Sequence, residues 1–342
     1  MILNSEGPLR AAQLGVLATL AEMKHSAVVK ASGSACEVLR SNNHTDGTPG
    51  REMNSLRYEA PSSLGDAIAL LAGASGTSRI LAGGTDIIVQ METDLIEPDL
   101  LIDIKKIPEL RRIAVENGAF RVGAAVTGME LTDHVAFCKA WPGVVDGVKL
   151  IGSMQIKGRA TMGGNLCNAS PAADSVPALI AAGAIARIAG PNGTRDVPVE
   201  NIPIGPGKTS LDKGEIIVSF LFPSRLSHSG DAYLRMTPRT EMDIAVVGVG
   251  INITLDAGGV CTAARVSLGA VAPTPSLVAE AGAALMGSRL DAPALDKLAQ
   301  AAAAACRPID DKRGTKEYRV KVAAVLAKRT ALLALERARR NT

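Results

Sequence analysis

The segment Arg159-Ala-Thr-Met-Gly-Gly-Asn-Leu-Cys-Asn-Ala-Ser-Pro-Ala-Ala-Asp174 is the part of the sequence that decides the fold. It has neither the 3.6-residue apolar period of a helix nor the two-residue period of a strand, so we expect a loop. Gly163 and Gly164 allow positive φ angles and a close approach of the backbone to a ligand. Thr161 and Asn165 supply hydrogen-bond donors and acceptors. The segment therefore predicts a loop that binds a polar ligand, with a plain polar surface loop as the alternative.

Another segment, Ile80-Leu-Ala-Gly-Gly-Thr-Asp86, leads from an apolar run through two glycines toward a short apolar helix. A strand that enters a helix through such a turn leaves backbone N–H groups free, and proteins often hold a pyrophosphate in this way. Gly83-Gly84 alone is weak support, because an ordinary strand-to-helix turn also needs glycine and a capping residue. The two segments together are more specific than either alone.

Together the two segments resemble the flavin-binding loops of the FAD-binding subunit of molybdenum hydroxylases, the xanthine dehydrogenase and carbon monoxide dehydrogenase family. The likeness runs from about Leu56 to Arg340. It implies an α+β chain, in which a two-subdomain FAD-binding fold of the vanillyl-alcohol-oxidase and p-cresol-methylhydroxylase superfamily precedes a C-terminal α+β domain of the carbon monoxide dehydrogenase flavoprotein type.

The resemblance and the pattern of predicted elements together predict four parts of the chain. We expect an α/β FAD-binding subdomain at 53–110, a mainly antiparallel subdomain at 111–225 and the C-terminal domain at 226–342. Residues 1–52 lie outside the resemblance and read as an extension with a helix at 9–30 and a polar linker at 41–50. We expect Met53 to be the natural start, with the preceding residues as either upstream reading frame or a disordered arm.

Apolar periodicity and turn residues predict the individual elements. In the first subdomain we expect a helix capped by Ser63 at 64–73, a strand at 79–82, a helix ending at Glu92 and a strand at 100–104. In the second we expect hairpin turns at Asn117-Gly118 and Pro191-Asn-Gly193, helices at 127–137, 142–151 and 177–182, and a strand at 215–222. In the third we expect strands at 232–236, 243–255 and 260–271 and helices at 276–286, 291–306 and 316–340.

The resemblance also assigns FAD-binding residues. The first glycine segment, residues 80–86, would wrap the pyrophosphate with Ala82, Gly83, Gly84, Thr85 and Asp86. The second glycine segment, residues 159–174, would bind the pyrophosphate, ribityl and ribose groups with Thr161, Gly163, Gly164, Asn165, Ser170 and Asp174. Ile151 and Ile217 would cover the flavin ring, and Lys208 and Arg235 would place positive charge near the ring and the ribityl chain. Asp174 is also a suitable acceptor for sugar hydroxyls on chemical grounds.

By the same resemblance, the chain would be one of three kinds of subunit. A large subunit would carry the molybdenum-pterin cofactor and a small subunit two [2Fe–2S] clusters, in an assembly of (αβγ)2 composition. The FAD subunit would take electrons from the clusters and pass them to an external acceptor. No catalytic residue for the organic substrate is expected in this chain. Gly-Gly-Thr-Asp at 83–86 departs from the Gly-Gly-His-Ser form common in carbon monoxide dehydrogenases, which disfavours carbon monoxide as the substrate.

Composition excludes several other classes of protein. The 342 residues include 37 basic and 34 acidic residues, a net charge of +3 without a basic stripe, so nucleic acid is not expected as a partner. The five cysteines and four histidines are scattered without ligand spacing, which predicts a cytoplasmic chain that binds no metal. We expect Cys167 to be a packing residue rather than a redox group. No run of apolar residues is long enough to span a membrane.

Two nucleotide-binding motifs fail on inspection. Gly205-Pro-Gly-Lys-Thr-Ser210 lacks the first glycine of a P-loop, because position 202 is Ile, and we expect it to link strands. Gly248-Val-Gly250 lacks the third glycine of a Rossmann motif, because position 253 is Ile.

Two other functions stay open at the level of sequence. A stand-alone FAD-dependent oxidoreductase would need a general base beside the ring, and no histidine is placed for that role. A flavin-binding subunit without turnover of its own is the second alternative. The sequence identifies neither the organic substrate nor the acceptor, which could be oxygen, a quinone or NAD.

Overall fold

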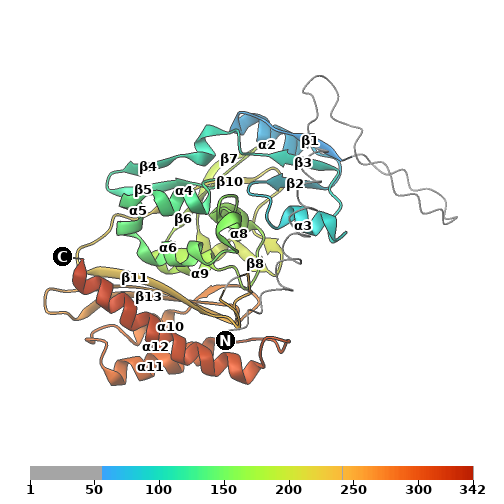
Figure 1. Ribbon diagram of the computed structural model, residues 1–342. Coiled ribbons are helices and arrows are strands. Elements are labelled where there is room, and N and C mark those ends of the chain that lie inside the picture. The colour runs from blue at the N-terminus through green and yellow to red at the C-terminus, as the bar shows by residue number, and fades with distance from the viewer. Residues whose placement is uncertain (1–55, 241, 342) are drawn as a thin grey trace, which may run out of the picture. The chain divides into compact units, whose positions relative to one another are not determined.

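The computed structural model of the protein describes residues 56–240 and 242–341 (Figure 1). The predicted extension at 1–52, its helix and linker, and the predicted start at Met53 lie outside these residues. None of the helices in the described ranges is long and apolar enough to cross a membrane.

A small parallel sheet with the strand order β1-β3-β2 forms the first part of the described chain. Its elements are β1 (Arg57–Glu59), α2 (Leu64–Gly73), β2 (Ser78–Leu81), α3 (Ile87–Glu92), β3 (Leu100–Asp103) and the 3-10 helix η1 (Pro108–Arg111). Ser63 caps α2 as predicted, because its Oγ accepts a hydrogen bond from the backbone N–H of Asp66 at 3.1 Å. The predicted α/β order is therefore confirmed. Strand β1 was not predicted, because three residues are too few to show a period.

An antiparallel sheet with the order β4-β5-β10-β6-β7 follows. Its strands are β4 (Ile113–Glu116), β5 (Ala119–Gly123), β6 (Ile185–Gly190), β7 (Gly193–Pro198) and β10 (Ile216–Phe222). Around it lie α4 (Gly128–Asp133), α5 (Val135–Ala140), α6 (Pro142–Lys149), α7 (Met154–Lys157), α8 (Met162–Cys167), α9 (Ser175–Ala182), η2 (Val199–Asn201), β8 (Pro203–Gly205) and β9 (Lys208–Thr209). Asn117 and Gly118 have φ angles of 51° and 81°, the positive values that the predicted type I′ turn requires.

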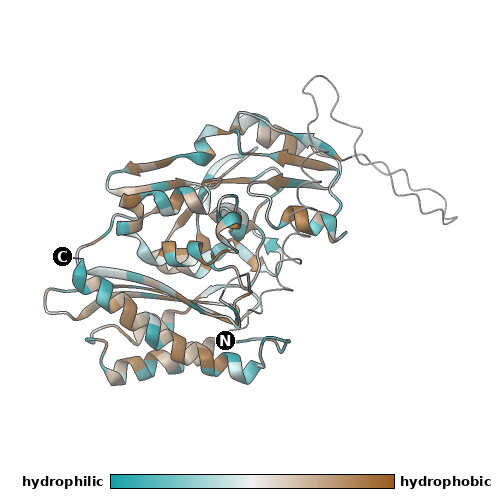
Figure 2. Ribbon diagram, viewed as in Figure 1, coloured by the Kyte–Doolittle hydropathy of each residue, from teal (hydrophilic) through white to brown (hydrophobic). Residues whose placement is uncertain are grey.

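A second antiparallel sheet, β11-β12-β13-β14, forms the C-terminal part. Its elements are β11 (Ser229–Met236), β12 (Val247–Leu255), β13 (Cys261–Gly269), β14 (Ser276–Leu277), α10 (Ala279–Ala283), α11 (Ala292–Ala305) and α12 (Lys316–Arg340). Helices α12 and α10 pack on one face of the sheet, and α6 and α9 lie against the other (Figure 1). Hydrophobic and hydrophilic residues alternate along α12 (Figure 2), as expected for a helix with one buried side.

Glycine in β12 allows α9 to approach this sheet closely. A Cβ atom at Gly250 would lie 2.5 Å from the carbonyl oxygen of Pro177. Gly250 of the rejected Rossmann motif therefore serves helix–sheet packing, whereas a Cβ atom at Gly248 would lie 2.5 Å from the hydroxyl of Tyr233 on β11.

The two faces of strand β11 contact different environments, an apolar cluster on one face and polar residues of the preceding domain on the other. Ala232 and Leu234 pack in the apolar cluster that includes residues of α12. Asp231, Tyr233 and Arg235 hydrogen-bond to residues of the preceding domain. Alternate side chains of a strand point to opposite faces, so this polar and apolar alternation places β11 between the two domains.

Three predicted elements differ from the structure. The segment at 159–174, predicted as a loop, contains α8, because Thr161 caps a short helix that no apolar period announces. The single helix predicted at 127–137 is two helices, α4 and α5, separated at His134, whose side chain caps α5. The helix predicted at 276–286 is a short strand, β14, followed by the five-residue helix α10. Short helices end where side-chain caps and tertiary packing override propensity.

We predict that Phe137→Ala destabilises the fold. Phe137 is 0% exposed and packs edge-on against Phe120 and Phe222. The substitution should lower the free energy of unfolding by about 3–5 kcal/mol, because it leaves a cavity in a packed core. Urea unfolding of the full chain measures the change. Val135→Ala, in the same helix at a residue that is 81% exposed, is the control and should change the free energy by less than about 0.5 kcal/mol.

Candidate functional site

A cavity of about 630 Å³ lies between the two glycine segments. It is lined by the turn from β2 into α3, by α8, and by residues at and before the start of β10. This volume is within the range of about 300–1,000 Å³ that is usual for small-molecule and cofactor sites.

The structure brings most of the predicted FAD-binding residues to this one cavity. Eleven of them line it: Ala82, Gly83, Gly84, Thr85, Asp86, Ile151, Thr161, Gly163, Gly164, Asn165 and Ile217. Four do not line it: Ser170, Asp174, Lys208 and Arg235.

The first glycine segment presents a row of free backbone donors. Among the described residues, no protein group accepts a hydrogen bond from the backbone N–H groups of residues 83–87. Gly84 has a φ angle of 84°, which a residue with a side chain rarely adopts. Successive free N–H groups in a turn form an anion-binding concavity. This part of the cavity therefore fits a phosphate or pyrophosphate group.

Glycine also allows close backbone contacts at two positions of the site, and the contact at Gly83 joins the two segments. A Cβ atom at Gly83 would lie 2.1 Å from the carbonyl oxygen of Arg159, and one at Gly163 would lie 2.5 Å from that of Ala124. The positive φ angles considered for Gly163 and Gly164 are not observed, because both residues belong to α8. Close packing of backbone against backbone is what requires glycine at 83 and 163.

Hydrogen bonds from the start of α9 fix the orientation of Asn165. Thr161 caps α8 by accepting a hydrogen bond from the N–H of Gly164 at 2.9 Å. The Oδ1 atom of Asn165 accepts from the N–H of Ser175 at 3.2 Å and from its hydroxyl at 2.7 Å. The side-chain oxygen is thus engaged by α9, which leaves the amide N–H₂ of Asn165 as its donor toward the cavity.

Asp174 lies behind the cavity in a buried cluster with two residues of β11. Its Oδ1 accepts from the hydroxyl of Tyr233 at 3.0 Å, and its Oδ2 accepts from the guanidinium of Arg235. Burial raises the pKa of Asp174 to about 6, although the adjacent Arg235 opposes that shift. Asp174 directly precedes Ser175, so the cluster joins the C-terminal sheet to the residue that orients Asn165.

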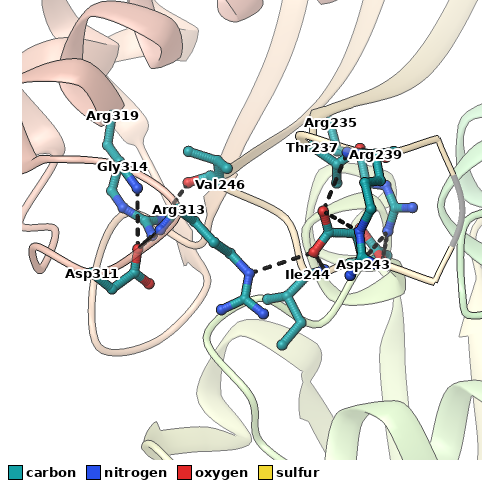
Figure 3. A network of polar contacts seen from close by, with 11 residues as sticks. Arg235, Thr237, Arg239, Asp243, Ile244, Val246, Asp311, Arg313, Gly314 and Arg319 are labelled. Atoms are coloured by element: carbon teal, nitrogen blue, oxygen red, sulfur yellow. Dashed lines mark hydrogen bonds and ion pairs between the residues drawn. The ribbon is translucent and has the colours of Figure 1, made fainter.

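Arg235 belongs to a wider polar network (Figure 3). Its guanidinium also donates to the carbonyl oxygen of Asp243 at 3.3 Å. The carboxylate of Asp243 accepts from Arg313 at 3.5 Å. Arg319 of α12 donates to the carbonyl oxygen of Val246, the residue just before β12, at 2.6 Å. The loop between β11 and β12 is therefore held by hydrogen bonds from Arg235, Arg313 and Arg319. These contacts fix the position of Arg235.

Comparison with known proteins decides what this arrangement is. Residues 52–225 match the family described as the FAD binding domain in molybdopterin dehydrogenase. Residues 232–334 match the CO dehydrogenase flavoprotein C-terminal domain. The chain belongs to the FAD-binding subunits of the molybdenum hydroxylase family. The predicted resemblance and the predicted order, an FAD-binding domain before a C-terminal α+β domain, are confirmed.

Individual relatives agree with this family. The xanthine dehydrogenase FAD-binding subunit of Escherichia coli O157:H7 is 32% identical over 274 residues, which cover 80% of this chain and 93% of the relative. The carbon monoxide dehydrogenase medium chain of Afipia carboxidovorans is 34% identical over 285 residues, which cover 83% and 98%. The relatives are subunits of oxidoreductases, as the sequence predicts for this FAD-binding subunit.

Solved structures are similar as well. Reconstituted CO dehydrogenase from Oligotropha carboxidovorans matches with a TM-score of 0.80 and 34% identity, covering 85% of this chain and 99% of the other. Quinoline 2-oxidoreductase from Pseudomonas putida 86 matches with a TM-score of 0.77 and 27% identity, covering 84% and 99%.

A second buried acid joins the two domains of this FAD-binding subunit. Asp231 accepts hydrogen bonds from the N–H of Val144 at 3.2 Å and from Arg225 at 3.0 Å. Burial raises the pKa of Asp231 to about 6. Nearby, Arg337 of α12 donates to Asp146 of α6 at 2.6 Å. A hydrogen bond from a backbone N–H to a carboxylate thus connects α6 with β11, and an ion pair connects α6 with α12.

The remaining predicted residues lie at the edge of the site or outside it. Ser170 is half-buried, and its Oγ accepts from the N–H of Ala172 at 3.3 Å. Lys208 is exposed on β9. Cys167 is exposed and lines the cavity, so it is not the packing residue that was predicted.

Several cavity residues were not predicted. They include Arg79, Gln90, Ile96, Asn168, Leu211 and Lys213. Gln90 lies four residues after Asp86 on the helix that follows the glycine turn, and this i, i+4 spacing could have identified it. Asn168 lies within the second glycine segment, residues 159–174. The others come from separate elements, and no local pattern indicates that they meet.

We predict that Asp174→Asn alters the pH dependence of stability. The pKa of Asp174 in the folded state is raised to about 6, above the value of about 3.9 for an unfolded chain. The stabilisation from protonating Asp174 is therefore full below about pH 4 and is lost as pH rises through about 6. Relative to the Asn variant, the unchanged chain should lose free energy of unfolding between about pH 5 and pH 7.

Urea unfolding of both proteins at both pH values measures this difference. Glu280→Gln, at an exposed position on α10, controls for the change in net charge and should leave the pH dependence unaltered. Identical pH dependence in the unchanged chain and Asp174→Asn would contradict the assignment.

Proposed function

We propose that this chain binds one FAD in the cavity and transfers electrons as the medium subunit of a molybdenum hydroxylase. In this proposal it takes electrons from [2Fe–2S] clusters of a small subunit and passes them to an external acceptor. The observation that carries the proposal is that both glycine segments, distant in sequence, line one cavity. Bound FAD supplies a group that accepts electrons and releases them.

The residues of the cavity fit the parts of FAD by their chemistry. The free N–H groups of residues 83–87 suit the pyrophosphate, because they are donors without a partner among the described residues. The amide N–H₂ of Asn165 suits an oxygen of the ribityl chain. Ile151 and Ile217 suit the flavin ring, since both line the cavity with apolar surface. FAD contacts of Thr85, Asp86, Thr161, Ser170 and Lys208 stay predictions.

We infer a supporting role for Asp174 and Arg235. Each is the other's partner in a buried ion pair, and neither lines the cavity. Their role in FAD binding is to fix the start of α9, where Ser175 orients Asn165. The charge of Arg235 is largely neutralised by Asp174, so it differs from the free positive charge expected near the ring.

We also propose the assembly and its location. The relatives are named medium chains or FAD-binding subunits, which supports a large molybdenum-pterin subunit and a small iron–sulfur subunit as partners. An (αβγ)2 composition, the domain boundaries at 53, 111 and 226, and a cytoplasmic location belong to the same proposal. No histidine lines the cavity among the described residues, so a stand-alone oxidoreductase with a histidine base gains no support.

Purification tests this function. We expect the full chain to bind about one equivalent of FAD and to show no substrate oxidation alone. With its large and small subunits, the flavin should be reduced by an organic substrate. The visible spectrum, FAD content and metal content of the complex provide the measurements. A colourless chain that refuses added FAD would contradict the proposal, as would substrate turnover by the chain alone.

We predict that Gly83→Ala impairs FAD binding. The added Cβ would lie 2.1 Å from the carbonyl oxygen of Arg159, so the two segments must separate. Affinity for FAD should fall by about tenfold or more, which corresponds to at least about 1.4 kcal/mol. Fluorescence titration of the full chain with FAD measures the affinity. Gly73→Ala is the matched control, because its Cβ would meet nothing within 4 Å.

A further inference from the structure

One hydrogen bond connects two walls of the cavity. The side-chain amide of Gln90, on α3, donates to Oδ1 of Asn168 at 3.0 Å. Asn168 is the residue that ends α8. Both side chains are half-buried and both line the cavity. The bond therefore joins the helix that follows the first glycine segment to the helix of the second.

The wall that carries Gln90 has little other anchorage. Helix α3 has six residues, none of which is buried. Ile88 and Val89 are 47% and 53% exposed. A helix this short is marginal without tertiary packing. Its position therefore depends on specific contacts such as the one that Gln90 makes.

The backbone of Gln90 extends the same wall. Its carbonyl oxygen accepts from the N–H of Leu95 at 2.9 Å and from that of Ile96 at 3.3 Å. Its own N–H donates to the carbonyl oxygen of Asp86 at 2.9 Å. Leu95, Ile96 and Asp86 all line the cavity. A shift of Gln90 would move both the free N–H groups of the turn and the loop after α3.

Asn168 is anchored more firmly. Its N–H donates to the carbonyl oxygen of Gly164 at 2.9 Å, within the second glycine segment. The next residue, Ala169, accepts from the N–H of Gly207 at 3.0 Å, and Gly207 also lines the cavity. Asn168 thus gives the weakly packed α3 a fixed point on the better-packed wall.

We propose that the Gln90–Asn168 hydrogen bond is a latch that retains FAD in this subunit. Gln90 and Asn168 act as positioning residues. They keep the cavity wall formed by α3 against the wall formed by α8, so that both walls contact the cofactor at once. The inference rests on the proposed function, because it concerns the same cavity. Loss of the latch allows α3 to move away, and bound FAD then leaves faster.

Gln90→Met tests the latch, because methionine keeps the length of the side chain and removes the amide. We expect FAD to leave the full chain about 3- to 10-fold faster, the effect of losing one neutral hydrogen bond. The rise in flavin fluorescence after dilution of the FAD-loaded chain measures the release rate. The urea midpoint of the chain without FAD should not change, since α3 buries no residue. Gln300→Met, at an exposed position on α11, is the matched control and should release FAD at the original rate.

A double-mutant cycle separates the latch from independent effects of each residue. Asn168→Leu should accelerate release as Gln90→Met does, and the double variant should be no faster than either single variant. Additive effects, or release from Gln90→Met at the original rate, would overturn the latch while the unchanged chain still binds FAD. Failure of the unchanged chain to bind FAD would overturn the proposed function and the latch together.

Discussion

The contact between Gly83 and the backbone of Arg159 is the constraint on which the site depends. A Cβ atom at this position would lie 2.1 Å from a carbonyl oxygen, so only glycine permits the approach. Because the two chain segments touch here, the free N–H groups of the first face the same cavity as the amide of Asn165. A cofactor with a pyrophosphate at one point and a polar chain at another requires both sets of donors together. Backbone sterics, more than side-chain chemistry, therefore create this site.

The C-terminal domain supports the site from behind. Strand β11 supplies Tyr233 and Arg235 to Asp174, which directly precedes the residue that orients Asn165. The same strand supplies Asp231 to the backbone of α6. Buried ion pairs are weak evidence for stability, because desolvation offsets much of their attraction. Their directional geometry makes them suitable for fixing how the two domains meet.

Sequence alone identified the family, the cavity-forming segments and most of the elements, because these depend on local patterns. Glycine pairs, turn dipeptides such as Asn117-Gly118 and the long period of α12 are visible in one dimension. Asp174 and Arg235 were assigned to FAD by resemblance, and nothing in the sequence indicates that their side chains pair with each other. Such a pairing depends on how β11 meets α9, which is tertiary information. The pairing of Gln90 with Asn168 was missed for a similar reason, since the two residues are 78 positions apart in the sequence.

The alternation along β11 also constrains its register. Asp231, Tyr233 and Arg235 take one face and Ala232 and Leu234 the other. A slip of one residue against β12 would turn the polar side chains of β11 into the apolar cluster beneath α12. It would also leave Asp174 without its partners Tyr233 and Arg235. Misaligned pairings of this strand are therefore penalised twice, by burial of charge and by loss of ion pairs. The polar residues of β11 that contact the preceding domain thus favour the correct register when the C-terminal sheet forms.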